Sequence, residues 1–340
     1  LALVIMVGLA IAISSATQDI TIDALRIEQI GENEGRSMAA GAAISVVGWW
    51  TGYKIGGGIS LLSAEFLERK GLENYWQLSF LVLSAIILIC SFFLLYIPEK
   101  SSLQRKNIQD IADQKILAKM GYTNKFSKII SWLTGTVINP LTSFFKKNTV
   151  KVAIGILGFI FLFKIGEAFL GRMSIVFYKE IGFSKTDIAL YSKGIGWITT
   201  IVFTLIGGLF AIKMGLVKAM FVSGIIMALT NLMFSVLAWV GNSEMLFAFT
   251  VLLDDLAAAF ATVAFVAFIS ALVDRSYTAT QYALLASIGT AGRTLFASSS
   301  GALVDWLNGD WAIFFIITAL MVIPSLICLL LIKKNLKLND

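Results

Sequence analysis

The sequence predicts an all-α fold, a polytopic bundle of membrane-spanning helices. Hydrophobic residues make up 58% of the 340 residues. Charged residues make up only 14%, whereas an average soluble domain has about 25%. Long apolar runs recur along the whole chain, and about 20 such residues are needed for a helix to cross the hydrocarbon core of a bilayer. The short alternating segments of a membrane β-barrel do not appear.

Nine apolar segments are long enough to span the bilayer. They lie at about residues 3–27, 37–63, 75–97, 150–178, 187–212, 216–240, 245–272, 278–304 and 311–332. Residues 98–149 form the only long polar stretch, which we interpret as a cytoplasmic linker with amphipathic helices. The expected organisation is therefore three spans in 1–97, the linker in 98–149 and six spans in 150–340.

Lysine and arginine are unevenly distributed between the predicted loops. If the first span runs from outside to inside, 18 of the 27 basic residues lie on the cytoplasmic side and four on the outer side. Cytoplasmic loops of membrane proteins carry an excess of basic residues. The sequence therefore predicts a cytoplasmic C-terminus and an N-terminus on the outer side.

The composition excludes several classes of function. The chain has no histidine, so His-based metal sites and Ser-His-Asp chemistry are excluded. Its two cysteines, Cys90 and Cys328, lie in apolar runs without metal-ligand spacing. The sequence has no Walker motif and no dinucleotide fingerprint. We expect no enzyme activity, no cofactor, no metal ion and no nucleic-acid partner; the expected partners are the lipid bilayer, protons and a small-molecule substrate.

Weak internal similarity relates the second span to the eighth. Residues 42–48 resemble residues 286–292 when Gly48 is aligned with Gly292, at an offset of 244 residues. Transporters of the major facilitator type are built from two six-helix halves related as parallel repeats. We therefore expect nine of the twelve helices of such a fold. The first three would be missing, and a separate polypeptide is one source that could supply them.

Ionisable side chains within the spans predict a polar cavity, because a charge near the bilayer centre costs about 2.5–3.5 kcal/mol. We expect one of three acids to carry the coupling proton, since a desolvated carboxylate binds a proton more readily: Asp19, Asp23 or Glu167. We expect six further polar or charged residues to bind the solute: Gln18, Lys164, Lys193, Asp254, Asp255 and Arg293.

Structural explanations stay open for several of these residues. Lys164 and Glu167, three residues apart on one helix face, could form a satisfied pair. Asp23 with Arg26 could simply end a helix near the cytoplasmic surface. The aromatic stripe of the second span, with Trp197 of the fifth, is interpreted as helix packing: Trp49, Trp50, Tyr53 and Trp197.

Five blocks of residues occur in order along the chain: 15–24 (SATQDITIDA), 41–48 (GAAISVVG), 163–168 (FKIGEA), 265–267 (FVA) and 279–285 (ATQYALL). Together they resemble the AmpG family of muropeptide permeases, from that family's fourth helix onward. The resemblance implies a major facilitator fold in the bacterial inner membrane. It also implies proton-coupled import of N-acetylglucosamine–anhydro-N-acetylmuramyl peptides for cell-wall recycling.

On this resemblance Asp19 and Asp23 match the acid pair of the family's fourth helix, and Lys164 and Glu167 match the charged pair of its seventh. Two departures are evident. The family's glycine-rich tenth-helix motif reads DDLAAAFA at 254–261 in this chain. An Arg that the family often has after the first glycine of the helix matching our second span is replaced by Trp50. Two alternatives stay open: a carrier of the acetyl-coenzyme A type, which should need a stronger basic cluster, and a truncated membrane protein that does not transport.

Overall fold

The computed structural model describes residues 2–30, 34–98, 111, 133–184, 187–188, 190–191 and 196–336. Every regular element in these ranges is a helix, and they contain no strand. The all-α prediction is therefore confirmed. Lys193 and most of the predicted linker at 98–149 lie outside the described residues.

Three long helices precede the linker: α1 (Ala2–Gln29), α2 (Gly35–Arg69) and α3 (Tyr75–Leu94). We call them the N-terminal group. They coincide with the first three predicted spans, although α2 continues beyond residue 63, the predicted end of its span, to Arg69.

The remaining helices form the C-terminal group, which begins after the π-helix Thr134–Ile138 and α6 (Asn139–Lys147). Its members are α7 (Val150–Leu162), α8 (Ile165–Glu180), α10 (Gly196–Met214), α11 (Leu216–Val240), α12 (Glu244–Leu272), α13 (Thr278–Ala297), α14 (Ser300–Trp306), α15 (Trp311–Leu320) and α16 (Ile323–Ile332). Short 3₁₀ turns, Arg275–Tyr277 and Lys333–Asn335, precede α13 and follow α16.

Six described helical stretches are long and apolar enough to cross a membrane: Ala2–Gln29, Tyr75–Leu94, Val150–Glu180, Leu216–Val240, Glu244–Leu272 and Trp311–Asn335. The other three predicted spans correspond to α2, to the shorter apolar stretch Ile198–Met214 within α10, and to α13 with α14. The helix order thus agrees with the predicted bundle.

The fourth and the last predicted spans are each broken in the middle. Pro324 in the first turn of α16 accounts for the break after α15, because proline removes a backbone donor and clashes with the carbonyl four residues earlier. The break between α7 and α8 falls at Lys164 and is enclosed by two glycines. A Cβ on Gly292 of α13 would lie 2.0 Å from the Phe161 carbonyl oxygen, and one on Gly166 would lie 2.3 Å from that of Thr318. Only glycine permits both approaches.

Two hydrophobic cores lie at opposite ends of the bundle. One combines Ile27, Val152, Leu216, Leu272 and Ile332, whose sequence neighbours include Arg26, Lys151, Lys218, Arg275 and Lys333, and we call this the basic end. The other is dominated by aromatic residues of the C-terminal group, and we call it the aromatic end. Its fully buried rings are Phe177, Phe234, Phe247, Phe314 and Phe315.

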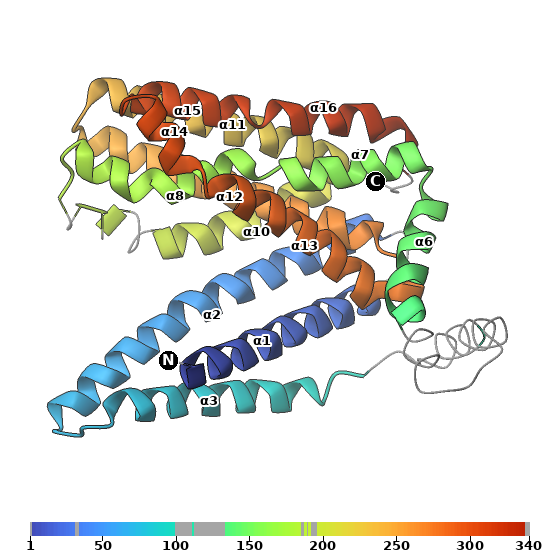
Figure 1. Ribbon diagram of the computed structural model, residues 1–340, viewed down its shortest axis with the longest axis horizontal. Coiled ribbons are helices and arrows are strands. Elements are labelled where there is room, and N and C mark those ends of the chain that lie inside the picture. Colours follow the sequence, from blue (N-terminus) through green and yellow to red (C-terminus); the bar gives the residue numbers. More distant parts are fainter. Residues whose placement is uncertain are drawn as a thin grey trace.

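Within the described residues, the two helix groups meet toward the basic end. In Figure 1, α1 and α2 approach the other helices at the end where α6 lies and spread away toward the opposite end, while α3 packs on α2. The burial pattern agrees: Asp23, Ala24 and Ile27 are the buried residues of α1, and all lie in its last two turns. Buried residues of α2 are likewise concentrated in 38–46. The fold therefore leaves the facing surfaces of the groups open toward the aromatic end.

Candidate functional site

Lys164 is a buried cation at the centre of the C-terminal group. Its Nζ donates a hydrogen bond of 2.7 Å to Thr262 Oγ1 of α12 and one of 3.1 Å to Glu167 Oε1, while Glu167 Oε2 lies 2.9 Å away. Only 8% of Lys164 is exposed. The broken span places this residue directly before α8, where the first N–H groups of a helix lack intrahelical partners. The site therefore combines a buried cation with the positive end of a helix.

Two further acids extend this group along α12. Asp254 lies within electrostatic range of Lys164, Glu167 and Asp255. Asp255 Oδ2 accepts a hydrogen bond of 2.8 Å from Thr199 Oγ1 of α10, and Asp255 lines a pocket of about 310 Å³ between α10 and α12. We call Lys164, Glu167, Thr262, Asp254 and Asp255 the central cluster. Its residues all belong to the C-terminal group.

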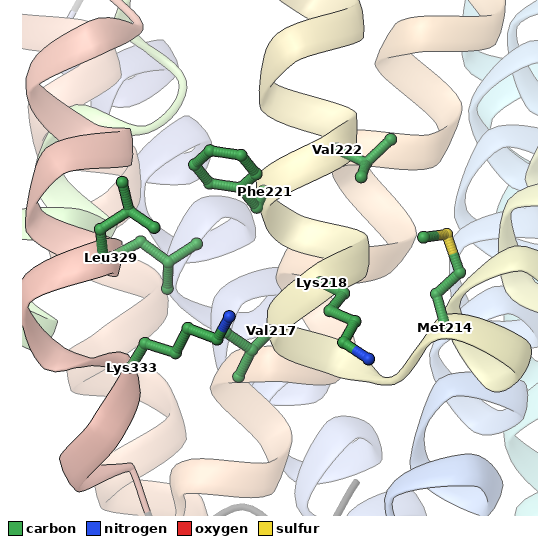
Figure 2. A pocket seen from close by; sticks show the side chains of 8 residues that line it. Met214, Val217, Lys218, Phe221, Val222, Leu329 and Lys333 are labelled. Carbon is green, nitrogen blue, oxygen red and sulfur yellow. The ribbon is translucent and has the colours of Figure 1, made fainter.

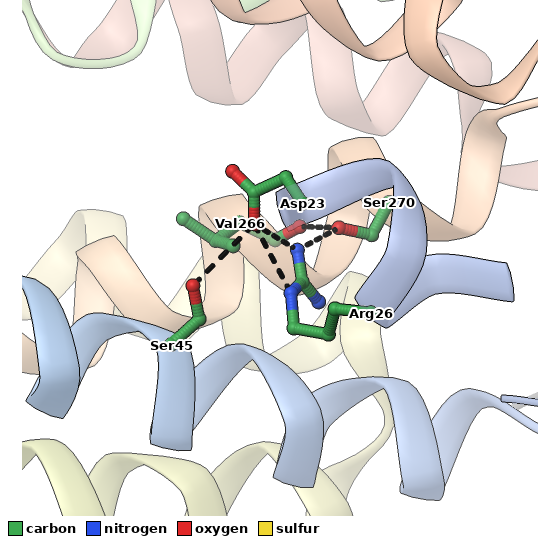
Figure 3. A network of polar contacts seen from close by, with 5 residues as sticks. All are labelled: Asp23, Arg26, Ser45, Val266 and Ser270. Carbon is green, nitrogen blue, oxygen red and sulfur yellow. Dashed lines mark hydrogen bonds and ion pairs between the residues drawn. The ribbon is translucent and has the colours of Figure 1, made fainter. Parts of the chain in front are cut away.

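A second charged cluster joins the two helix groups at the basic end (Figure 3). Arg26 of α1 donates to Asp23 Oδ1 through Nε at 3.1 Å and through Nη2 at 2.9 Å. Arg26 Nη2 also donates to Ser270 Oγ of α12 at 3.1 Å, and Ser45 of α2 donates to Asp23 Oδ1 at 3.4 Å. We call these four residues the bridging cluster, because α12 belongs to the C-terminal group and α1 and α2 do not.

Other contacts reinforce the bridge. Arg275 Nη1 donates to the carbonyl oxygen of Ile27, and Tyr282 of α13 lies beside Asp23. The offset of 244 residues that aligns Gly48 with Gly292 also aligns Arg26 with Ser270, and these two side chains touch. The two-fold repeat itself stays a prediction.

Three predicted site residues lie in neither cluster. Gln18 and Asp19 precede Asp23 on α1 and are exposed, with Asp19 within electrostatic range of Asp23. Arg293 is also exposed. Arg293 follows Tyr282 by 11 residues, which places it about 16 Å farther along α13 and on nearly the same helix face. Arg293 is therefore displaced from the bridging cluster toward the aromatic end. Lys193 lies outside the described residues.

The structure adds residues that the sequence did not single out. Thr262, Ser270 and Ser45 provide cross-helix partners for the charges. Their hydroxyls are ordinary in apolar helices, so only the charged residues gave a signal in the sequence.

The aromatic residues of α2 are more exposed than helix packing would require. Trp50 packs against the core of the basic end, but Trp49 is 57% exposed and Tyr53 is 68% exposed. Their rings stack with centroids 5.7 Å apart and planes 3° apart. Both follow Val46, a buried residue of the α2 face that contacts the C-terminal group, by three and seven residues. They therefore continue that face into the open region.

A polar connection outside the spans ties α6 to the loop after α12. Asp274 accepts hydrogen bonds from Ser143 Oγ at 2.5 Å and from Ser276 N at 2.9 Å. Burial acts to raise the pKa of Asp274, but these hydrogen bonds, with Lys147 nearby, outweigh it and lower the pKa below its ordinary value.

Comparison with known proteins places this geometry in a family. No family model matches the chain. The putative transporter AmpG 4 of Rickettsia felis is 32% identical over 334 residues, which cover 96% of this chain and 72% of that protein. The chain belongs to the AmpG family of transporters. The predicted resemblance is confirmed, and the chain is a multi-pass membrane protein.

Other AmpG relatives have similar coverage. The putative transporter AmpG 4 of Rickettsia conorii is 33% identical over 331 residues, covering 96% of this chain and 70% of that protein. The anhydromuropeptide permease of Escherichia coli strain K12 is 28% identical over 338 residues, covering 98% of this chain and 61% of the permease. This AmpG chain therefore spans roughly 60–70% of the length of these relatives.

Proposed function

We propose that this AmpG protein imports anhydromuropeptides across the bacterial inner membrane by proton symport. The observation that carries the proposal is Lys164, a buried cation held at a helix break beside Glu167 and Asp254. Paired charges in a low-dielectric interior gain little net stability. Ionisable residues within membrane spans typically serve transport. The name of the E. coli relative, an anhydromuropeptide permease, supports this choice of substrate.

The chemistry of the site suits the two parts of such a substrate. Peptide stems carry carboxylates, which the buried Lys164 and the N-terminal end of α8 can bind, and Arg293 offers a second, exposed cation. The stacked rings of Trp49 and Tyr53 offer a flat apolar surface for the faces of sugar rings. Sugar and peptide would then contact opposite helix groups.

Glu167 is the proposed proton carrier of the central cluster. In the described state it pairs with Lys164, and a substrate carboxylate arriving at Lys164 would displace it. A buried acid that loses its cation favours the protonated form. Binding of substrate and of a proton would thereby be coupled. Asp19, exposed in the open region, is the proposed entry point of the proton.

The bridging cluster is the proposed gate. We assign the basic end to the cytoplasm because of the excess of Lys and Arg there, and we therefore propose that the C-terminus lies on that side. The described state is then closed toward the cytoplasm and open outward. Rocking of one helix group against the other would break the contact between Arg26 and Ser270 and open the inner side.

The test is uptake of labelled anhydromuropeptide by liposomes containing the purified chain. We expect accumulation when the liposome exterior is acidified and its collapse on adding a protonophore. Accumulation that survives the protonophore would refute proton symport, and absence of binding to the protein would refute the substrate. Relatives named as permeases do not favour the acetyl-coenzyme A carrier or the non-transporting alternative.

A further inference from the structure

A pocket at the basic end lies on the outer surface of the bundle, away from both charged clusters. It has a volume of about 230 Å³ and is formed where α10 ends, α11 begins and α16 ends. Figure 2 shows Lys333 reaching from the end of α16 toward α11, with Lys218 at the start of α11. The other lining residues are all apolar: Met214, Val217, Phe221, Val222, Leu329 and Leu330. Leu329 is buried while Leu330 is exposed, so the pocket is open on its outer side.

Among the described residues, the two lysines have no counter-charge. Both are exposed, and within the described part of the chain neither forms a hydrogen bond or an ion pair. No acidic residue lines the pocket. Lys218 lies in the first turn of the 25-residue α11, where the helix dipole disfavours cations and favours anions. An anion at the start of α11 would therefore lie beside Lys218 and the positive end of the helix, on the side of the pocket toward which Lys333 extends (Figure 2).

An apolar wall beside a pair of cations is the arrangement that fits a charged lipid. Basic pockets between membrane helices on the cytoplasmic side bind anionic lipid headgroups. The apolar residues line the remainder of the pocket, where an acyl chain meets no polar group. We infer that this pocket binds an anionic glycerophospholipid, with its phosphate between Lys218 and Lys333 and one acyl chain along Phe221, Val222 and Leu330. The assignment to the inner leaflet depends on the proposed orientation, but the site itself does not.

The experiment compares binding of fluorescent phosphatidylglycerol and phosphatidylcholine to the purified full chain in neutral detergent. We expect phosphatidylglycerol to bind at least tenfold more tightly. The double variant K218Q/K333Q should lose about tenfold of that affinity. The matched control, K213Q/K334Q, removes two exposed lysines at the same end that do not line the pocket, and its affinity should change less than twofold.

A second variant tests the apolar part. Val222→Phe fills the pocket without changing charge, so it should weaken phosphatidylglycerol binding several-fold while the chain elutes unchanged in size-exclusion chromatography. Inorganic phosphate at millimolar concentration should compete poorly. Full competition by phosphate would show that the site binds a free anion and would refute the proposal that it binds a lipid. Equal losses in K218Q/K333Q and K213Q/K334Q would show a general charge effect and overturn the site.

Discussion

The central and bridging clusters both contain an acid and a base three residues apart on one helix, yet they differ in what lies across from that pair. Lys164 bonds to Thr262 within its own helix group, so its partners remain together when the groups move. Arg26 bonds to Ser270 of the other group, so its partners separate. On the proposed mechanism, the same local motif therefore serves one site that would persist in every state and one contact that would exist only in the closed state.

Removing the central cation should have the largest effect. Lys164→Met deletes a charged hydrogen bond to the substrate carboxylate, a loss that typically costs about 1.5–3 kcal/mol, or roughly one to two decades of affinity. Calorimetric titration with anhydromuropeptide measures it. Lys179→Met, which removes an exposed lysine of α8, is the control and should bind normally. If Lys164→Met binds the substrate normally, the ion pair of Lys164 with Glu167 serves the structure and not substrate binding.

Glu167→Gln should separate binding from coupling. The amide preserves size and hydrogen bonding but cannot carry a proton, so gradient-driven accumulation should fall about tenfold while exchange down the substrate gradient continues. Asp19→Asn, at the proposed proton entry, should reduce accumulation less. A larger loss in Asp19→Asn than in Glu167→Gln would move the proton carrier to α1.

Arg26→Gln should release the bridge while leaving the hydrogen bonds of Lys164 in place. In a background with both cysteines replaced by serine, Cys introduced at Ala43, which is buried where α2 packs against Gly208, should react several-fold faster with a membrane-impermeant thiol reagent. Arg36→Gln, an exposed arginine at the start of α2, provides the control. Unchanged labelling would show that the bridging cluster does not hold the groups together.

Trp49→Ala tests whether one substrate contacts both helix groups. Loss of one stacking ring should weaken binding of the complete muropeptide by roughly two- to tenfold. Binding of the peptide stem without its sugars should be unaffected. An equal loss for both ligands would mean that Trp49 supports the fold rather than a sugar.

Asp274 provides the smallest expected effect, because its contact lies outside both clusters. Its pKa is lowered in the folded protein, so its stabilising contribution is present above its ordinary pKa of about 4 and is lost as pH falls through the lowered value. Thermal unfolding of the native chain should lose this contribution, less than about 1 kcal/mol for such a half-exposed group, below pH 4. Asp274→Asn should show the lower stability already at pH 7 and a flatter acid limb.

The sequence predicted what local spacing determines. The apolar runs predicted the helices, and the close spacing of Lys164 with Glu167 left open the ion pair that the structure contains. It could not predict Thr262 or Ser270, which are 98 and 244 residues from their partners and carry no charge. Nor did it predict the exposure of Trp49, because an aromatic residue on an apolar helix has the same pattern in a core and in an open region. The break at Lys164 depends on glycines of α13 and α8, whose role appears only once the helices are packed.

α12 carries a residue of each cluster, Thr262 bonded to Lys164 and Ser270 bonded to Arg26, about 12 Å apart along one helix. Because both residues belong to α12, a displacement of this helix would affect substrate binding and the bridging contact together. If substrate at Lys164 weakens the bridge by a given factor, thermodynamic reciprocity requires that breaking the bridge strengthens substrate binding by the same factor. Substrate affinity measured in Arg26→Gln therefore also reports cooperativity. Its change from the native value gives the coupling free energy between the substrate site and the proposed gate.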